Sequence, residues 1–155
     1  MFMVTQFYKL AKKYCTFIDT KTLSGETLEE LTALLLQLYL QGLSLPDTAS
    51  EEPKGGRYKT LICLPFPRLR SALPTDYSMI YDPFAPPEEA LATRNLADDL
   101  GDIYLDLQEG ILAYEAGTPG EACFCWRWGL NNHWGTHLTD ALKALHWLRT
   151  NEKGK

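Results

Sequence analysis

The segment from position 98 to position 109 carries a high density of acidic side chains. They are Asp98, Asp99, Asp102, Asp106 and Glu109. After Arg94 the chain has no lysine or arginine before Arg127, so no basic neighbour in the sequence offsets this charge. Like charges at three- and four-residue spacing destabilise a helix, and partial burial adds to the cost. The sequence therefore predicts that these carboxylates meet hydrogen-bond donors from another segment, or a cation.

Two histidines are the candidate partners of these acids. His133 and His137 stand one helical turn apart in the sequence HWGTH, and on a continuous helix both imidazoles fall on the inward, apolar face. His146 falls on the opposite face and is predicted to be exposed or packed at the surface. Imidazole nitrogens and carboxylate oxygens on facing helices are the groups from which bundles build metal sites. The spacing thus predicts an Asp/His cluster between two helices.

The helix that carries the acids is expected to run from Asn95, its N-cap, to about Tyr114. On a helical wheel, Asp99 and Asp106 border the apolar face, and Asp102 lies one step further round. Three carboxylates are therefore expected to line one edge of the core.

The sequence TPGE marks the start of the helical stretch that carries the histidines. Thr118 is the predicted N-cap, Pro119 takes the first helical position and Glu121 completes a capping box. The helical pattern continues to about position 150, and glycines and asparagines predict a kink or break within residues 129–133.

Two further helices are expected nearer the N-terminus. Apolar residues recur at three- and four-residue steps over residues 2–19, and a second apolar helix is predicted over 28–42, with Thr27 as N-cap and Glu30 completing a capping box.

The sequence between the second helix and the acidic helix is rich in turn-forming residues and prolines, with basic residues clustered in 54–70. No long segment shows the period-two alternation of a strand. The predicted fold is all-α: a four- to five-helix up-and-down bundle with a Pro-rich irregular insertion between helices two and three, forming one domain over residues 1–155.

Composition excludes some classes of function. The 155 residues include 15 basic and 20 acidic side chains, a net charge of −5, which argues against binding to nucleic acid or to an anionic membrane. Lysines interrupt the first apolar run, and no segment has the length of a membrane span, so a cytoplasmic protein is expected.

The first interpretation of the polar residues is structural. Asp99, Asp102 and Asp106 would accept hydrogen bonds or ion pairs from His133, His137, Arg127 or the Arg68–Arg70 loop. The chain would then be a non-enzymatic binding or protein-interaction module, and the sequence favours this interpretation because buried polar groups usually satisfy one another.

The second interpretation is a divalent metal site, and it implies a metal-dependent hydrolase-like enzyme. His133, His137 and Asp102 would hold the ion, and Asp99 or Asp106 would complete the site or serve as general base. An H-x-x-x-H pair is a weak signal by itself, and the first histidine lacks the adjacent glutamate of HExxH peptidases. No other cofactor is indicated.

The third interpretation is a pocket for a small molecule or a docking site for a protein partner. Its candidate lining residues are Trp126, Trp128, Trp134, Tyr104 and Arg127. Trp128 falls opposite the core face of its helix and is predicted to be exposed, which hints at an interface.

Three blocks of the sequence resemble a known family. YDPF, LADDLGDIYLDLQEGI and WRWGLNNHWGTHLTDALKALH occur in the order of the signature blocks of DUF5063, a bacterial domain of unknown function. The resemblance implies a small, mostly helical bacterial protein and no particular reaction. It places the following residues inside signature blocks: Asp98, Asp99, Asp102, His133, Trp134 and His137.

Overall fold

A computed structural model of the chain describes residues 2–47, 73–80, 84 and 91–151. The basic part of the insertion, residues 54–70, lies outside the described residues, as do the loop arginines proposed to meet the acids.

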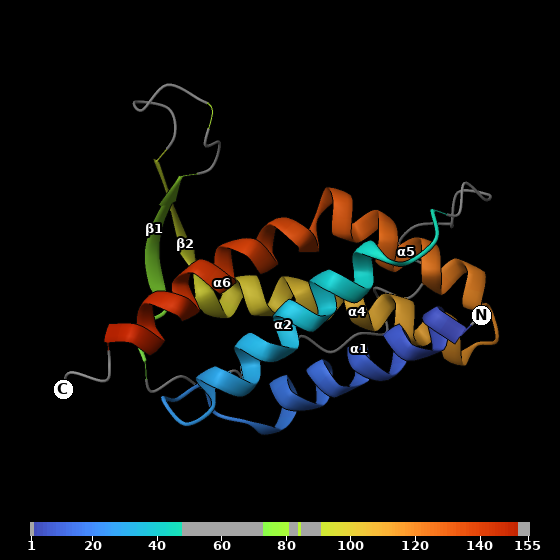
Figure 1. Cartoon of the computed structure of the whole chain (residues 1–155), viewed down its shortest axis with the longest axis horizontal. Coiled ribbons are helices and arrows are strands. Elements are labelled where there is room, and N and C mark those ends of the chain that lie inside the picture. The colour runs from blue at the N-terminus through green and yellow to red at the C-terminus, as the bar shows by residue number, and fades with distance from the viewer. Residues whose placement is uncertain (1, 48–72, 81–83, 85–90, 152–155) are drawn as a thin grey trace.

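The described residues form a helical bundle with one small β-ribbon (Figure 1). The helices are α1 (Phe2–Thr20), α2 (Leu28–Leu43), α4 (Leu96–Glu115), α5 (Pro119–Asn132) and α6 (Trp134–Asn151), and the strands are β1 (Asp76–Ile80) and β2 (Leu91–Asn95). The all-α prediction is confirmed, since these helices make up most of the chain. None of the helices in the described ranges is long and apolar enough to cross a bilayer.

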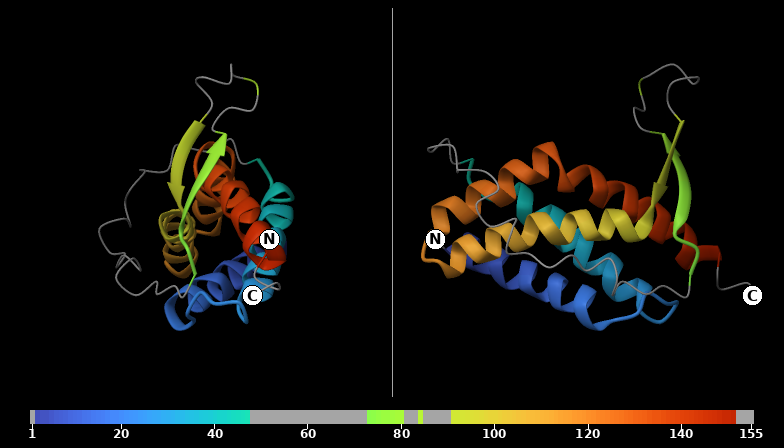
Figure 2. Two further views of the ribbon diagram at one scale, coloured as in Figure 1. Left: turned by 90° about the vertical axis from the view of Figure 1, so that its left-hand side faces the viewer. Right: turned by 180° about the vertical axis from the view of Figure 1, so that it is seen from behind.

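The chain direction alternates along only part of the bundle. In Figures 1 and 2, α1 and α2 run in opposite directions, and α4 runs opposite to the consecutive helices α5 and α6. Across the insertion, however, α4 repeats the direction of α2. The predicted up-and-down alternation therefore does not hold between these two helices, because a long connection can return the chain to its starting end.

Large aromatic side chains fill the centre of the bundle. Trp126, Trp134 and Phe7 are fully buried, and the ring centroid of Phe7 lies 5.0 Å from that of Trp126. Each indole N–H finds a carbonyl inside the core: Trp126 Nε1 donates to Leu107 O at 3.1 Å, and Trp134 Nε1 donates to Trp126 O at 3.0 Å. The bundle thus buries its largest side chains with their polar atoms satisfied.

The helix starts follow the predicted positions, although the capping chemistry differs. Asn95 caps α4, since its Oδ1 accepts from the N–H of Ala97 at 2.9 Å and of Asp98 at 3.3 Å. Thr27 and Thr118 precede α2 and α5 as predicted, but within the described residues neither side chain accepts a capping hydrogen bond. Both predicted capping boxes are wrong, because each threonine hydroxyl instead donates to a carbonyl of the preceding turn.

The predicted break in the histidine stretch is present and separates α5 from α6. His133 stands between the two helices with φ −148° and ψ −83°, far from helical values. Gly135 permits the tight bend between the two helices, because a Cβ at this position would lie 2.0 Å from the carbonyl oxygen of Leu130.

The β-ribbon was not predicted. Strands β1 and β2 pair antiparallel, with Tyr77 opposite Arg94, and Figure 2 shows them at the end of the bundle where α4 begins, beside α6. Each strand has only five residues, so any alternation of buried and exposed positions is too short to stand out in the sequence. The ribbon matters because it carries Tyr77 toward the acidic face of α4.

Candidate metal centre

The acids of α4 and the histidines near the start of α6 meet along the contact between these helices. Asp99 is the most buried of the acids, with 1% of its surface exposed. Asp102 and Asp106 follow at three- and four-residue spacing, and Asp99 and Asp102 project toward α6 while Asp106 projects toward the junction of α5 and α6. Asp98 is exposed, as expected for a side chain on the outer face.

Asp99 binds two donors from different elements. The Nδ1 atom of His137 lies 2.9 Å from Asp99 Oδ1, and the hydroxyl of Tyr77 donates to Asp99 Oδ2. The hydrogen bond to Asp99 raises the pKa of His137 above its ordinary value, against the opposing effect of burial. Burial first, and then the hydrogen bond to Asp99, raises the pKa of Tyr77. Asp99 therefore joins the ribbon, α4 and α6 through one carboxylate.

Asp106 and His133 form a second pair of the same kind. The Nδ1 atom of His133 lies 2.8 Å from Asp106 Oδ2. The two imidazole rings are neighbours, with centroids 4.9 Å apart and edge to face. The His133 side chain is 45% exposed, so the prediction that it points inward is wrong. The wheel assumed a continuous helix, whereas the break at His133 turns this side chain toward solvent.

The two hydrogen-bonded pairs occupy Nδ1 of each imidazole and leave Nε2 of each available for a further contact. When Nδ1 donates to a carboxylate, the neutral ring carries its lone pair on Nε2. For His137, this atom lies 3.5 Å from Asp102 Oδ2, beyond a normal hydrogen bond. One possible ligand atom from each of Asp102, His133 and His137 lies within 4.8 Å of the others. Two imidazoles and one carboxylate form a ligand set typical of zinc or non-haem iron.

Asp99 and Asp106 occupy the positions of supporting residues in this arrangement. A ligating histidine usually gives its other ring N–H to a carboxylate, which fixes the tautomer and the orientation of the ring. Both histidines show this geometry, each on a different aspartate. The five residues predicted from the sequence as metal candidates thus lie together. Three of them face one another, Asp102, His133 and His137, and the other two, Asp99 and Asp106, support the histidines.

The electrostatic surroundings include residues that sequence reasoning missed. Asp140 of α6 has a buried Oδ2 atom that finds no hydrogen-bond partner among the described residues. Burial, and next the proximity of Asp99, raises the pKa of Asp140, while Arg94 lowers it. Arg94 of β2 also acts on Tyr77 and His137. The one signal in the sequence that could have identified Asp140 is its position three residues after His137, which places the two side chains on neighbouring positions of one helix face.

The residues predicted to line a binding pocket are not gathered around this cluster. Trp126 and Trp134 belong to the core, and the Tyr104 hydroxyl faces Asp19 Oδ2 at 3.4 Å. Arg127 donates to the carbonyls of Gly42 and Leu43, at 3.1 and 3.0 Å, and so caps the end of α2 instead of meeting the acids.

Trp128 is exposed as predicted, at 54%. It borders, together with Arg127, a hollow of about 70 Å³, which is smaller than the usual range for small-molecule pockets.

Comparisons with known proteins identify a shared fold and a family, and they name no function. The crystal structure of protein BF1032 from Bacteroides fragilis resembles this chain with a TM-score of 0.65 and 19% sequence identity, over 95% of each chain. At this identity the likeness shows the fold alone. No curated protein matches the sequence. The family model for a domain of unknown function, DUF5063, matches residues 2–151, and the chain therefore belongs to the DUF5063 family.

Proposed function

We propose that the chain binds one divalent transition-metal ion between α4 and α6, with Asp102, His133 and His137 as ligands. The supporting observation is the pairing of both Nδ1 atoms with buried or half-buried carboxylates, which leaves both Nε2 atoms for a ligand. Asp102 supplies the oxygen, and its side chain is 32% exposed, so water and small molecules reach this side of the cluster.

The ligand number favours a reactive site over a structural one. Structural zinc sites are closed by four protein ligands, whereas catalytic sites hold the ion with three and keep a position open. An ion bound here would act as a Lewis acid on a molecule that approaches from solvent. In this proposal Asp99 and Asp106 orient the imidazoles, because each already accepts a histidine N–H. The general-base role considered for them from the sequence has no such support.

The competing function is a protein-interaction module with a purely structural cluster. It is supported by the same hydrogen bonds, since each imidazole already has an acidic partner at normal distance. The two functions differ in what happens when zinc is offered to the protein.

The test is zinc binding by EDTA-treated protein, measured by calorimetry on the wild type and on His133→Ala, His137→Ala and His146→Ala. His146 is the matched control because it is an exposed histidine on the same helix. We expect one zinc ion per chain in the wild type and in H146A, and a loss of more than about 100-fold in affinity in the other two variants. Since His133 is half exposed, H133A keeps its fold and remains informative even if H137A unfolds. Equal zinc affinity in all four proteins, or none, would contradict the proposal and leave the interaction module.

A further inference from the structure

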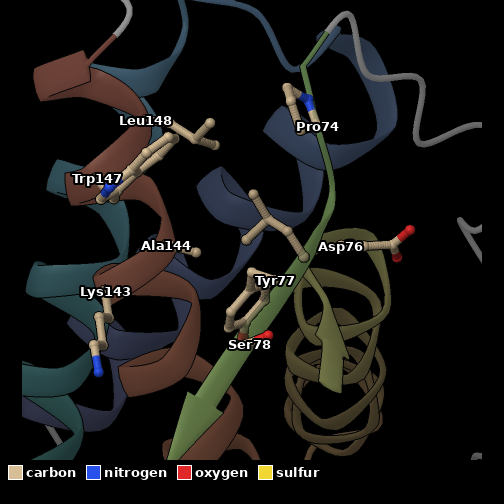
Figure 3. Close-up of a pocket in the computed structure, with 9 residues that line it drawn as sticks. Pro74, Asp76, Tyr77, Ser78, Lys143, Ala144, Trp147 and Leu148 are labelled. Atoms are coloured by element: carbon tan, nitrogen blue, oxygen red, sulfur yellow. The ribbon is translucent and has the colours of Figure 1, made fainter. Parts of the chain in front are cut away.

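A second hollow in the structure lies between β1 and α6. It has a volume of about 360 Å³, within the range of small-molecule pockets. Figure 3 shows Trp147, Ala144 and Lys143 on the α6 side and Tyr77 and Ser78 on the β1 side. The pocket and the metal centre share Tyr77, whose ring lines the pocket while its hydroxyl bonds to Asp99.

The walls offer a mostly apolar surface with two aromatic rings. Leu96, Ala144 and Leu148 contribute aliphatic groups, and Tyr77 and Trp147 contribute the rings. Trp147 is 62% exposed, although an indole is among the largest apolar side chains available to a core. An exposed tryptophan beside an apolar pocket provides a flat surface on which an aromatic ligand can stack.

The charge at the pocket favours an anion. Lys143 lines it and forms neither an ion pair nor a hydrogen bond with the part of the chain that the structure describes, and its charge acts at longer range on Asp140, which also acts on Tyr77. Asp76 also belongs to the lining, but its Oδ1 accepts a hydrogen bond from Asn95 Nδ2 at 2.6 Å, and Figure 3 shows its side chain on the far side of β1 from Trp147. The ammonium group of Lys143 is thus the charge available to a ligand, in a protein whose net charge of −5 otherwise repels anions.

We propose that this pocket binds a small aromatic carboxylate, with its ring between Tyr77 and Trp147 and its carboxylate at Lys143. The proposal does not require a bound metal ion, because none of the groups it uses is a proposed metal ligand, although Tyr77 also donates a hydrogen bond to Asp99.

The experiment uses two probes that share one ring system and differ in charge: 2-naphthoate and the neutral 2-naphthamide. Binding is measured by calorimetry in EDTA, so that the result does not depend on metal. For the wild type we expect naphthoate to bind with a Kd below about 1 mM and naphthamide to bind more weakly. In Lys143→Gln, naphthoate binding weakens roughly fivefold and naphthamide binding does not change, because only the carboxylate uses the lysine charge.

Trp147→Ala tests the apolar part of the pocket. We expect it to weaken both probes by about tenfold, because both lose the stacking surface. The matched controls are Lys13→Gln, an exposed lysine of α1, and Trp128→Ala, an exposed tryptophan of α5, and both should bind like the wild type. All the substituted side chains are exposed, so the variants keep their fold. The proposal is overturned if naphthoate fails to bind at millimolar concentration, or if it binds K143Q or W147A as well as it binds the wild type.

Discussion

Helix α4 packs against α5 with one kind of surface and against α6 with another. Toward α5 it presents Gly110 and the carbonyl of Leu107, and the indole of Trp126 lies so close that a Cβ on Gly110 would stand 2.1 Å from its Nε1 atom. Toward α6 it presents acids that meet histidines. The first contact excludes everything except protein atoms, whereas the second leaves imidazole nitrogens and a carboxylate with capacity for a ligand.

The difference shows how one helix can serve stability and chemistry at once. On the apolar side the only polar atom of the indole donates to Leu107 O, so nothing remains to bind another molecule. On the polar side the buried hydrogen bonds organise the groups, and the exposed edge at Asp102 and His133 stays accessible. Stability should therefore depend most on the α5 side, and metal binding only on the α6 side.

The largest effect is expected for Trp126→Ala. Removing a fully buried indole from the α4–α5 contact leaves a cavity and should lower the free energy of unfolding by about 3–5 kcal/mol. Urea denaturation in EDTA measures this change in the free energy of unfolding. Trp128→Ala, two residues away and exposed, is the control and should stay within about 0.5 kcal/mol of the wild type. A loss similar in both variants would mean that the α4–α5 contact does not carry the stability assigned to it.

A smaller loss of stability is expected for Asp99→Ala, together with an effect on zinc. The substitution removes the acceptor of both His137 Nδ1 and the Tyr77 hydroxyl, so two poorly hydrated donors lose their partner, at a cost of about 2–3 kcal/mol in EDTA. Because His137 is then no longer oriented, zinc affinity should also fall by roughly 10- to 100-fold.

Two variants separate these contributions. Asp98→Ala removes the neighbouring, exposed carboxylate and should cost about 0.5 kcal/mol or less, with unchanged zinc affinity. Tyr77→Phe removes one of the two hydrogen bonds to Asp99 and leaves the histidine in place, so it should cost about 1 kcal/mol and have less effect on zinc than D99A. If D99A lowers stability and leaves zinc affinity unchanged, the Asp99 pair is structural and does not support a metal ligand.

Local spacing in the sequence explains what could be predicted. The acids of α4 lie within a few helical turns of one another, so a wheel places them correctly around that helix, and it also places His137 correctly. Asn95 was identifiable as a cap because its role depends on the N–H groups of the next three residues. The helical fold follows from the same short-range periodicity.

The parts that could not be predicted depend on contacts between distant segments. Tyr77 reaches Asp99 across 22 residues of sequence, on a strand too short to show a pattern. The exposure of His133 depends on where the helix break falls within the predicted window, and a shift of one residue changes the direction of the side chain. Arg127 looked like a partner for the acids, yet the end of α2 lies closer and takes its hydrogen bonds.

The smallest loss of stability is expected at an exposed polar cluster formed by Tyr8, Lys12 and Glu115. This cluster serves as a reference for the buried hydrogen bonds at Asp99. Lys12 and the Tyr8 hydroxyl both donate to Glu115 Oε1, at 2.9 and 2.7 Å, and the hydrogen bond from Lys12 is the main reason that the pKa of Glu115 is lowered. Because the Glu115 side chain is 43% exposed, Glu115→Gln should cost only about 0.5 kcal/mol or less at pH 7.

The pH dependence of this small loss has a definite sign. A carboxyl group whose pKa is lowered on folding stabilises the protein above its unfolded pKa of about 4.3 and loses that contribution as the pH falls through the folded value. The stability difference between wild type and E115Q should therefore shrink on acidification, which urea denaturation at pH 7 and at low pH can measure. A difference that grows would contradict the assignment. Since Glu115 and Asp99 each accept two side-chain donors, the excess loss in D99A over the matched Glu115→Ala measures what burial adds to the same kind of hydrogen bond.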